Sequence, residues 1–366
     1  KRQGGGGMEV NAISIGSKVH VAWVEAFGTS KTANVSLEDV AKREMTVSLA
    51  MDQYGSRFIQ QRLEKAPASH KDVTFDQIYP FTLQLCADVF GNYVIQKLFD
   101  HGTIEHKKAL ATMLKGNVLA LSMQMYGCRV VQKAIDVLNL DQKTELVQEL
   151  HGHVLKCVRD QNGNHVIQKC IGKAPPSMVQ FIVDAFTQQS IKLAMHPYGC
   201  RVIQRLLEHC SSAQRNAILE EVLESAQMLA KNQYGNYVIQ HVLIHGNADH
   251  RAKVMESFRG SLLSLSKHKF ASNVVEKCVT HATRDERKGL IDEILGDPDL
   301  DSASLPLMAM ARDQYANYVV QRLVEVVDPE QRQYLINRIH PHLQYLSKVS
   351  YGKHIIASIE KAQNSF

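Results

Sequence analysis

Residues 90–99 read FGNYVIQKLF, and versions of this stretch recur along the whole chain. The eight seven-residue signatures are YGSRFIQ from Tyr54, FGNYVIQ from Phe90, YGCRVVQ from Tyr126, NGNHVIQ from Asn162, YGCRVIQ from Tyr198, YGNYVIQ from Tyr234, FASNVVE from Phe270 and YANYVVQ from Tyr315. Their glycine or alanine positions are separated by six steps of 36 residues and one of 45. Repeats of this length cannot bury an apolar face alone, so they stack into a solenoid with equivalent positions in rows.

The segments between the signatures carry a helical pattern. Apolar residues recur there at three- and four-residue spacing, as in Leu110, Met113 and Leu114. Helix starts are marked by a capping-box pattern at 211–214 and by the Asp-Pro pair at 328–329. Each unit is therefore predicted to hold a short helix, the signature helix and a third helix, which makes the fold all-α.

Some parts of the chain depart from the repeat. The long step contains the sequence GDPDLDSASL at 296–305, which is predicted to be a surface loop. Residues 1–7 are a glycine-rich tail, and residues 8–28 could form extended structure. We therefore expect an amino-terminal tail of unclear structure at 1–30 and one elongated repeat domain at 31–366. A ninth copy at 351–357, YGKHIIA, lacks the glutamine and is predicted to be a cap.

Composition restricts the class of protein. No run of about 18 apolar residues occurs, so no membrane span is expected, and no secretory signal is recognisable. The seven cysteines lack a paired spacing, which favours reduced thiols in the cytosol or nucleus. The net charge of +5 is modest for a protein held to nucleic acid by bulk charge. Nucleic-acid recognition would therefore depend on contacts with bases.

Two positions of the signature vary while their neighbours stay nearly constant. In FGNYVIQKLF the apolar residues form one helical stripe, which places Asn92 and Gln96, one turn apart, on a shared polar face. Such a pair means little alone, but eight in register indicate a code. The pairs are Ser56 with Gln60, Asn92 with Gln96, Cys128 with Gln132, Asn164 with Gln168, Cys200 with Gln204, Asn236 with Gln240, Ser272 with Glu276, and Asn317 with Gln321.

The residue after the first member of each pair points about 100° around the helix, toward the neighbouring unit. These wedge residues are Arg57, Tyr93, Arg129, His165, Arg201, Tyr237, Asn273 and Tyr318. Seven of the eight carry a planar group that can stack on a nucleobase, and the adjacent amides can read a base edge. The row is therefore predicted to bind single-stranded nucleic acid.

Donor and acceptor patterns assign a base to each pair. The Watson–Crick edge of uracil alternates acceptor, donor and acceptor, which Asn with Gln can match. Guanine presents two adjacent donors, and Glu276 is the only carboxylate in the row that could accept both. A small Ser or Cys beside Gln leaves room for a purine, and an Arg wedge accompanies it in units one, three and five, which favours adenine there.

A basic row follows the second member of each pair, and it consists of Lys97, Lys133, Lys169, Arg205, Lys277 and Arg322, completed by Gln61 and His241. These charges could form a solvated face or approach phosphates. Packed helices are roughly 8–10 Å apart, whereas stacked bases are ~3.4 Å apart. One base per unit therefore requires an extended single strand.

These signatures, pairs and wedges resemble the PUF family of Pumilio-type proteins from about residue 36 to the end. The resemblance implies a right-handed superhelical, armadillo-like solenoid of eight three-helix repeats with terminal caps. It also implies a crescent that binds RNA on its concave face, one base per repeat, with the strand antiparallel to the protein. That polarity, with the assigned bases, predicts the target 5′-UGUAUAUA-3′.

The resemblance further implies binding to mRNA 3′ untranslated regions in the cytoplasm. Repression of translation and promotion of mRNA decay, through protein partners of the deadenylation machinery, are expected on the same ground. The protein is expected to be a monomer.

Other classes of function are less well supported. His151 with His153, or His340 with His342, could suggest a metal site, but no Cys or carboxylate stands at ligand spacing. No phosphate-binding glycine loop or nucleophile motif is present, so no enzyme activity, catalytic residue, metal or cofactor is expected. A scaffold for proteins alone would leave the planar wedges unexplained. A ribosome-assembly relative that binds structured RNA loosely is disfavoured by the intact eight-unit code.

Overall fold

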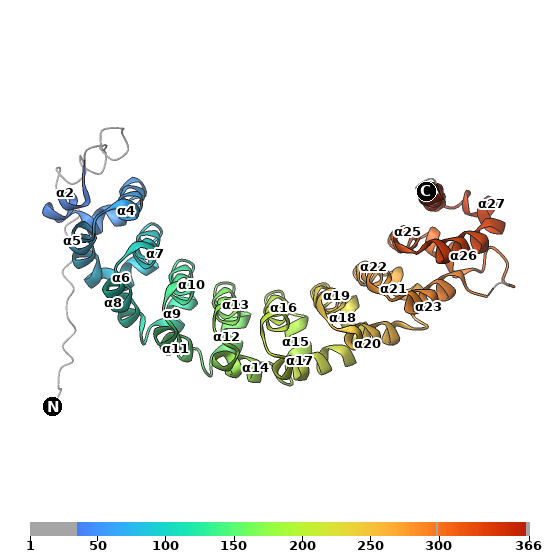
Figure 1. Ribbon diagram of the computed structural model, residues 1–366, viewed down its shortest axis with the longest axis horizontal. Helices are drawn as coiled ribbons and strands as arrows, with labels where there is room; N and C mark the ends of the chain where they lie inside the picture. Colours follow the sequence, from blue (N-terminus) through green and yellow to red (C-terminus); the bar gives the residue numbers. More distant parts are fainter. Residues whose placement is uncertain (1–34, 298, 364–366) are drawn as a thin grey trace, which may run out of the picture. The chain divides into compact units, whose positions relative to one another are not determined.

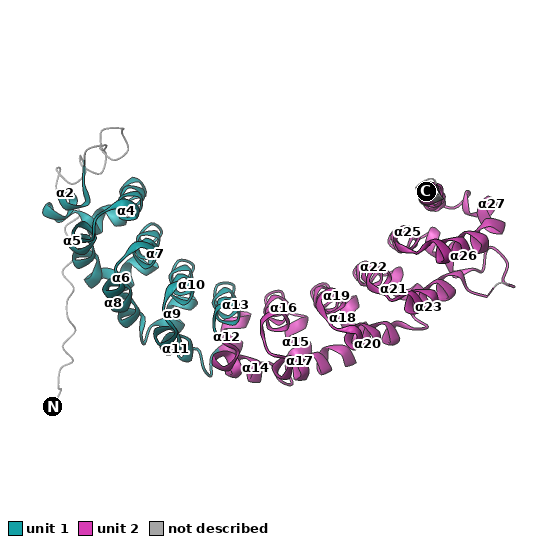
Figure 2. Ribbon diagram, viewed as in Figure 1, with its two compact units in different colours: residues 1–153, 160–174 teal, residues 154–159, 175–366 magenta. Residues whose placement is uncertain are grey.

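The computed structural model describes residues 35–297 and 299–363, so the segment predicted to be extended, residues 8–28, lies outside it. Within the described ranges the chain forms helices and turns, with no β-strand. It divides into two compact units, which are residues 35–153 with 160–174, and residues 154–159 with 175–363 (Figure 2). The division falls inside the fourth repeat.

Unit 1 consists of short helices that follow one another in a fixed order. They are α2 (Leu37–Lys42), α3 (Thr46–Ala50), α4 (Gln53–Lys65), α5 (Ala68–Ile78), the 3₁₀ turn η2 (Tyr79–Phe81), α6 (Thr82–Ala87), α7 (Gly91–His101), α8 (Ile104–Leu114), α9 (Val118–Ser122), α10 (Gly127–Val137), α11 (Leu140–Gln148) and α13 (Gly163–Lys173). The signature helices α4, α7, α10 and α13 pack successively on one another, and in Figure 1 they lie side by side.

Unit 2 follows the same plan. It holds α12 (Val154–Arg159), the 3₁₀ turn η3 (Pro176–Val179), α14 (Gln180–Phe186), α15 (Ser190–Ala194), α16 (Gly199–His209), α17 (Ser212–Glu224), α18 (Ala226–Lys231), α19 (Gly235–His245), α20 (Ala248–Phe258), α21 (Leu262–Ser266), α22 (Ala271–His281), α23 (Arg284–Leu295), α24 (Pro306–Ala311), α25 (Ala316–Val326), α26 (Pro329–Ile339), the 3₁₀ turn η4 (His340–His342), α27 (Leu343–Leu346) and α28 (Gly352–Gln363). The signature helices α16, α19, α22 and α25 again pack in succession (Figure 1).

The predicted plan of three helices per unit is confirmed. In the second repeat, for example, the short helix α6, the signature helix α7 and the third helix α8 pack on one another. Their apolar stripes meet in the core, where Phe99, Leu98 and Ile95 of α7 are fully buried. The capping box at Ser211 and Gln214 and the Asp328 cap before Pro329 are both present.

Close helix crossing explains the small residue in each signature. The signature helix begins against the main chain of the short helix before it. A Cβ atom added at Gly199 would lie 2.4 Å from the carbonyl oxygen of Leu193, far inside van der Waals contact. Glycine therefore permits the crossing, while repeats seven and eight carry Ala271 and Ala316 at the same position.

Half-buried carboxylates tie the end of the third helix to the start of the short helix within three of the repeats. Glu149, at the end of α11, accepts hydrogen bonds from the main-chain N–H groups of Gly116 (2.7 Å) and Val118 (3.0 Å) at the start of α9 in the same repeat. Glu221 and Glu293 make the same contacts in repeats five and seven. Each carboxylate satisfies N–H groups at the start of a short helix that have no intrahelical partner.

The predicted cap and loop have clear positions. Helix α28 of the ninth copy packs against α25, as expected of a terminal cap. The described part of the predicted loop, residues 296–297 and 299–305, connects α23 to α24 through turns, and Ser302 Oγ lies 2.7 Å from His342 Nδ1. In the described part of the chain, none of the helices combines the length and apolar character that crossing a membrane requires.

Candidate nucleic-acid interface

Seven of the eight signature helices are capped by a polar side chain three positions before the glycine or alanine. Asp88 accepts hydrogen bonds from the N–H groups of Phe90 (2.9 Å) and Gly91 (2.6 Å). In repeat five, Nδ1 of His196 accepts the equivalent bonds, and burial lowers the pKa of this ring, which favours the neutral form that can accept them. Sequence reasoning missed this capping row, although its spacing was visible. Its members are Asp52, Asp88, Asp160, His196, Asn232, His268 and Asp313.

The first member of every pair is buried rather than presented on an exposed polar face. The fractional exposure of these residues is between 1% and 4%. In the asparagine repeats, Nδ2 of Asn92 donates to the carbonyl oxygens of Asp88 (2.9 Å) and Val89 (3.0 Å). Both amide hydrogens are therefore used within the helix. The members of this buried row are Ser56, Asn92, Cys128, Asn164, Cys200, Asn236, Ser272 and Asn317.

The second member of every pair is half-buried, and in the asparagine and cysteine repeats it is bonded to the first member. Gln96 Nε2 donates to Oδ1 of Asn92 at 2.9 Å, and the same bond occurs in the other three asparagine repeats. In the cysteine repeats the glutamine instead donates to a main-chain carbonyl, as from Gln132 to Cys128 (3.0 Å). The glutamine amide is thus held by a side chain in one class and by the backbone in the other.

All eight wedge residues are exposed. Tyr93, Tyr237 and Tyr318 have exposed fractions of 52%, 47% and 59%, which is high for tyrosine. Arg57, Arg129, His165, Arg201 and Asn273 are exposed as well. The guanidinium carbon of Arg201 lies 5.5 Å from the centre of the Tyr237 ring, so adjacent wedges already stack on each other.

Glu276 has a distinct environment in repeat seven. Burial raises the pKa of its carboxyl group, while Arg322 and Lys277 act in the opposite direction. Because Ser272 donates to the Lys269 carbonyl (3.4 Å), the serine hydroxyl does not occupy the carboxylate. The carboxylate of Glu276 is thus left available as a double acceptor.

The basic row is largely engaged in ion pairs. Lys97 pairs with Glu64, Lys133 with Asp100 (3.0 Å) and Lys169 with Asp136 (3.7 Å), in each case on the preceding signature helix. Similarly, His241 pairs with Glu208 (3.0 Å) in unit 2. Arg205 and Arg322 pair with carboxylates of their own helices, Glu208 and Glu325. The contacts of Lys97, Lys133, Lys169 and His241 link neighbouring repeats, a role that sequence reasoning did not foresee.

Comparison with protein-family models identifies eight repeats of one kind. The model of the Pumilio-family RNA binding repeat, PUF, matches residues 46–79, 82–114, 117–151, 153–186, 189–223, 226–257, 261–295 and 307–340. These matches cover well over half of the chain, and each contains one signature helix.

Known proteins agree with this assignment. Pumilio homolog 2 of Xenopus laevis is 52% identical over 72 residues, and Pumilio homolog 3 of Arabidopsis thaliana is 54% identical over 56 residues. Those matches span 20% and 15% of this chain and 6% of each relative's length.

Solved structures match over nearly the whole chain. The Puf3 RNA-binding domain bound to a Cox17 RNA 3′ UTR recognition sequence is 40% identical with a TM-score of 0.82, covering 94% of this chain and 99% of that one. PUF-8 in complex with PBE-RNA is 36% identical with a TM-score of 0.86, covering 93% and 99%. The fold and the repeated row define a helical-repeat protein of the RNA-binding class. The chain belongs to the Pumilio (PUF) family.

Proposed function

We propose that residues 31–366 form a domain that binds single-stranded RNA with sequence specificity, reading one base per repeat and preferring 5′-UGUAUAUA-3′. One observation carries the proposal. In each of eight successive repeats, a buried Ser, Cys or Asn, a half-buried Gln or Glu and an exposed wedge occupy the same three positions. Stacking between wedges and hydrogen bonding by the pair are the two interactions that single-stranded RNA recognition uses.

The glutamine geometry supports the assigned bases. In the asparagine and cysteine repeats, one N–H of the glutamine is used internally, and the glutamine retains one N–H donor and its Oε1 acceptor. This edge matches N3–H and O4 of uracil, and equally N1 and N6–H of adenine, so glutamine alone cannot distinguish the two bases. The buried partner supplies the difference, because Cys128 lets Gln132 fold back onto the main chain and leaves space for the larger purine.

The target can be tested with two oligonucleotides. We expect UGUAUAUA RNA to bind more tightly than the same RNA with its guanine replaced by uracil, by ~1–3 kcal/mol for the lost bidentate contact. Fluorescence anisotropy at one fixed salt concentration measures the difference, since phosphate contacts depend strongly on salt. Equal affinity for the two oligonucleotides would refute the assigned code, and a selection from a random RNA pool would then define the true preference.

The wedge role can be tested at Tyr237. We expect Tyr237→Ala to weaken binding of UGUAUAUA by ~1–3 kcal/mol, because base stacking on the ring is lost. Tyr237→Phe is the matched control, since it keeps the ring and removes only the hydroxyl. An alanine variant that binds as tightly as the unchanged protein would remove the stacking role from this residue.

We further propose that the RNA belongs to mRNA 3′ untranslated regions, as in the Puf3 complex, and that binding represses translation and promotes mRNA decay. Partners from the deadenylation machinery and a cytoplasmic location form part of this proposal. The seven cysteines are buried and lack a paired spacing, which suits a reducing compartment. Knockdown followed by measurement of the half-lives of UGUA-containing transcripts tests the role, and unchanged half-lives would contradict it.

A further inference from the structure

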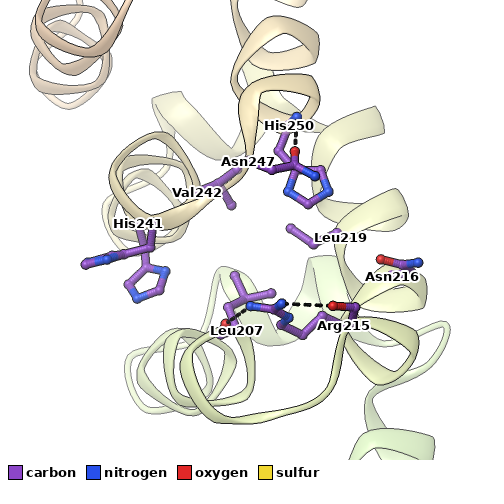
Figure 3. Close-up of a pocket in the computed structure, with 11 residues that line it drawn as sticks. Leu207, Arg215, Asn216, Leu219, His241, Val242, Asn247 and His250 are labelled. Carbon is purple, nitrogen blue, oxygen red and sulfur yellow. Dashed lines mark hydrogen bonds between the residues drawn. The ribbon is translucent and has the colours of Figure 1, made fainter.

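A cavity outside the reading row lies between repeats five and six. It has a volume of about 250 Å³ and is enclosed by the end of α16, the start of α17, the second half of α19 and the start of α20. Figure 3 shows Arg215 and Leu207 on one side and Val242 and His250 on the other. Since a water molecule occupies about 30 Å³ in the liquid, the cavity can hold a small polar ligand.

Nitrogen atoms without partners come from three of the lining residues. Nε of Arg215, Nδ1 of His241 and Nδ1 of His250 are buried and have no hydrogen-bond partner. The Arg215 side chain is fixed in place, because its Nη1 donates to the carbonyl of Leu207 (3.0 Å) and its Nη2 to Ser212 Oγ (3.3 Å). Buried polar groups are rarely left unsatisfied, so this cluster suggests an additional ligand.

The electrostatic character of the cavity favours an anion. Its eleven lining residues include one arginine and the histidines at 241, 245 and 250, and none of them is a carboxylate. The nearby Glu208 is already occupied by Arg205, His209 and His241. Burial lowers the pKa of His250, and Lys253 and Arg215 lower it further against the opposing effect of Asp249. Burial lowers the pKa of His241 as well, so the guanidinium of Arg215 supplies the fixed positive charge of the cavity.

The equivalent place between repeats one and two is closed. There Phe75 stacks on His106 with ring centres 4.1 Å apart, and Asp72 Oδ1 lies 3.0 Å from His106 Nε2. Residues 72, 75 and 106 correspond, 144 positions later, to Asn216, Leu219 and His250. Replacing a carboxylate by an amide removes the negative charge, and replacing Phe by Leu opens the space. The contact between repeats one and two therefore serves as a reference in which the space beside the histidine is filled.

We propose that this cavity is a binding site for a small oxyanion, phosphate or a phosphate monoester, held by Arg215, His241 and His250. The guanidinium forms charge-assisted hydrogen bonds to phosphate oxygens, and the two histidines supply further donors when protonated. Since Nε2 of His241 donates to Glu208, its Nδ1 is the atom that gains a proton beside the bound anion. The site is independent of the reading row and of the proposed RNA target.

The test is a titration of the whole chain with inorganic phosphate, using sodium chloride of equal ionic strength as reference. We expect saturable changes in the NMR signals of the ring protons of His241 and His250 with phosphate and none with chloride. The double variant Asn216→Asp with Leu219→Phe recreates the closed arrangement of repeats one and two. It should weaken phosphate binding about tenfold or more, because charge-assisted bonds are lost and space is filled.

Two comparisons decide the interpretation. Glu220→Gln, an exposed change on the same helix, should leave phosphate binding unaltered. The double variant should bind UGUAUAUA RNA within about twofold of the unchanged protein, as expected for separate sites. Phosphate effects that persist in the double variant, or that chloride reproduces, would overturn the proposal. Loss of RNA affinity together with phosphate binding would also overturn it, by assigning the cavity to the RNA backbone.

Discussion

Changing Ser272→Asn, Asn273→Tyr and Glu276→Gln together is expected to convert repeat seven from a guanine reader to a uracil reader. The variant reproduces the arrangement of repeat six, where Asn236 accepts from Gln240 at 2.9 Å. Uracil at the second position of the RNA should then bind better than guanine. Since each of the two matched contacts is worth ~1–3 kcal/mol, the reversal in relative affinity should exceed tenfold.

The carboxylate of Glu276 gives this prediction a second readout. Burial raises the pKa of Glu276, so it takes up a proton at a higher pH than an ordinary glutamate. A protonated carboxyl loses the ability to accept both guanine donors, so the guanine preference of the unchanged protein should decline as pH falls. The triple variant, with glutamine at 276, should show no such decline.

Both effects are measured with four RNAs that differ only in the second base of UGUAUAUA. The affinity of each RNA is determined for the unchanged protein and for the triple variant. The reciprocal double variant, Asn317→Ser with Gln321→Glu in repeat eight, should create a preference for guanine at the first base of the RNA. A triple variant that still prefers guanine would show that the pair is not the reader of this base.

Gly199→Ala is expected to destabilise the protein, and Gly289→Ala is expected to stabilise it. At Gly199 the new Cβ would lie 2.4 Å from the Leu193 carbonyl oxygen, so the short helix α15 must shift. Overpacking of this kind typically costs ~1–3 kcal/mol. At Gly289, inside α23, nothing lies within 4 Å of the new atom. There alanine should add ~1 kcal/mol through helix propensity alone.

Urea unfolding followed by circular dichroism compares the two variants with the unchanged protein. Both introduce the same atom into a helix, so the glycine's surroundings are the only intended difference. If Gly199→Ala were as stable as Gly289→Ala, the close crossing of α15 and α16 would not constrain the signature. The native alanines at 271 and 316 mark repeats whose short helices already accommodate the methyl group.

The repeat architecture could be predicted because its signals are local and recur. Apolar spacing located the helices, the 36-residue period located the repeats, and the Asp328–Pro329 pair located the start of α26. All eight wedges are exposed, as the proposed stacking on bases requires. Each of these features depends only on helical geometry within one unit.

The burial of the first pair member could not be predicted in the same way. Helical periodicity places Asn92 and Gln96 on one face, but it does not show which tertiary neighbours enclose that face, here the turn before the helix. The ion pairs of the basic row and the cavity beside His250 are missed for the same reason, since they depend on which side chains meet between repeats. The structure of an RNA complex would test the prediction that the basic row also approaches phosphates.

The burial of the first reader limits how specificity can evolve. A position with 1–4% exposure, enclosed by the turn before it, accepts serine, cysteine or asparagine but has no volume for a longer side chain. New base preferences must therefore arise mainly at the half-buried second position and the exposed wedge. Few base preferences are therefore open to the proposed pairs, because close packing around the first member restricts which side chains fit there.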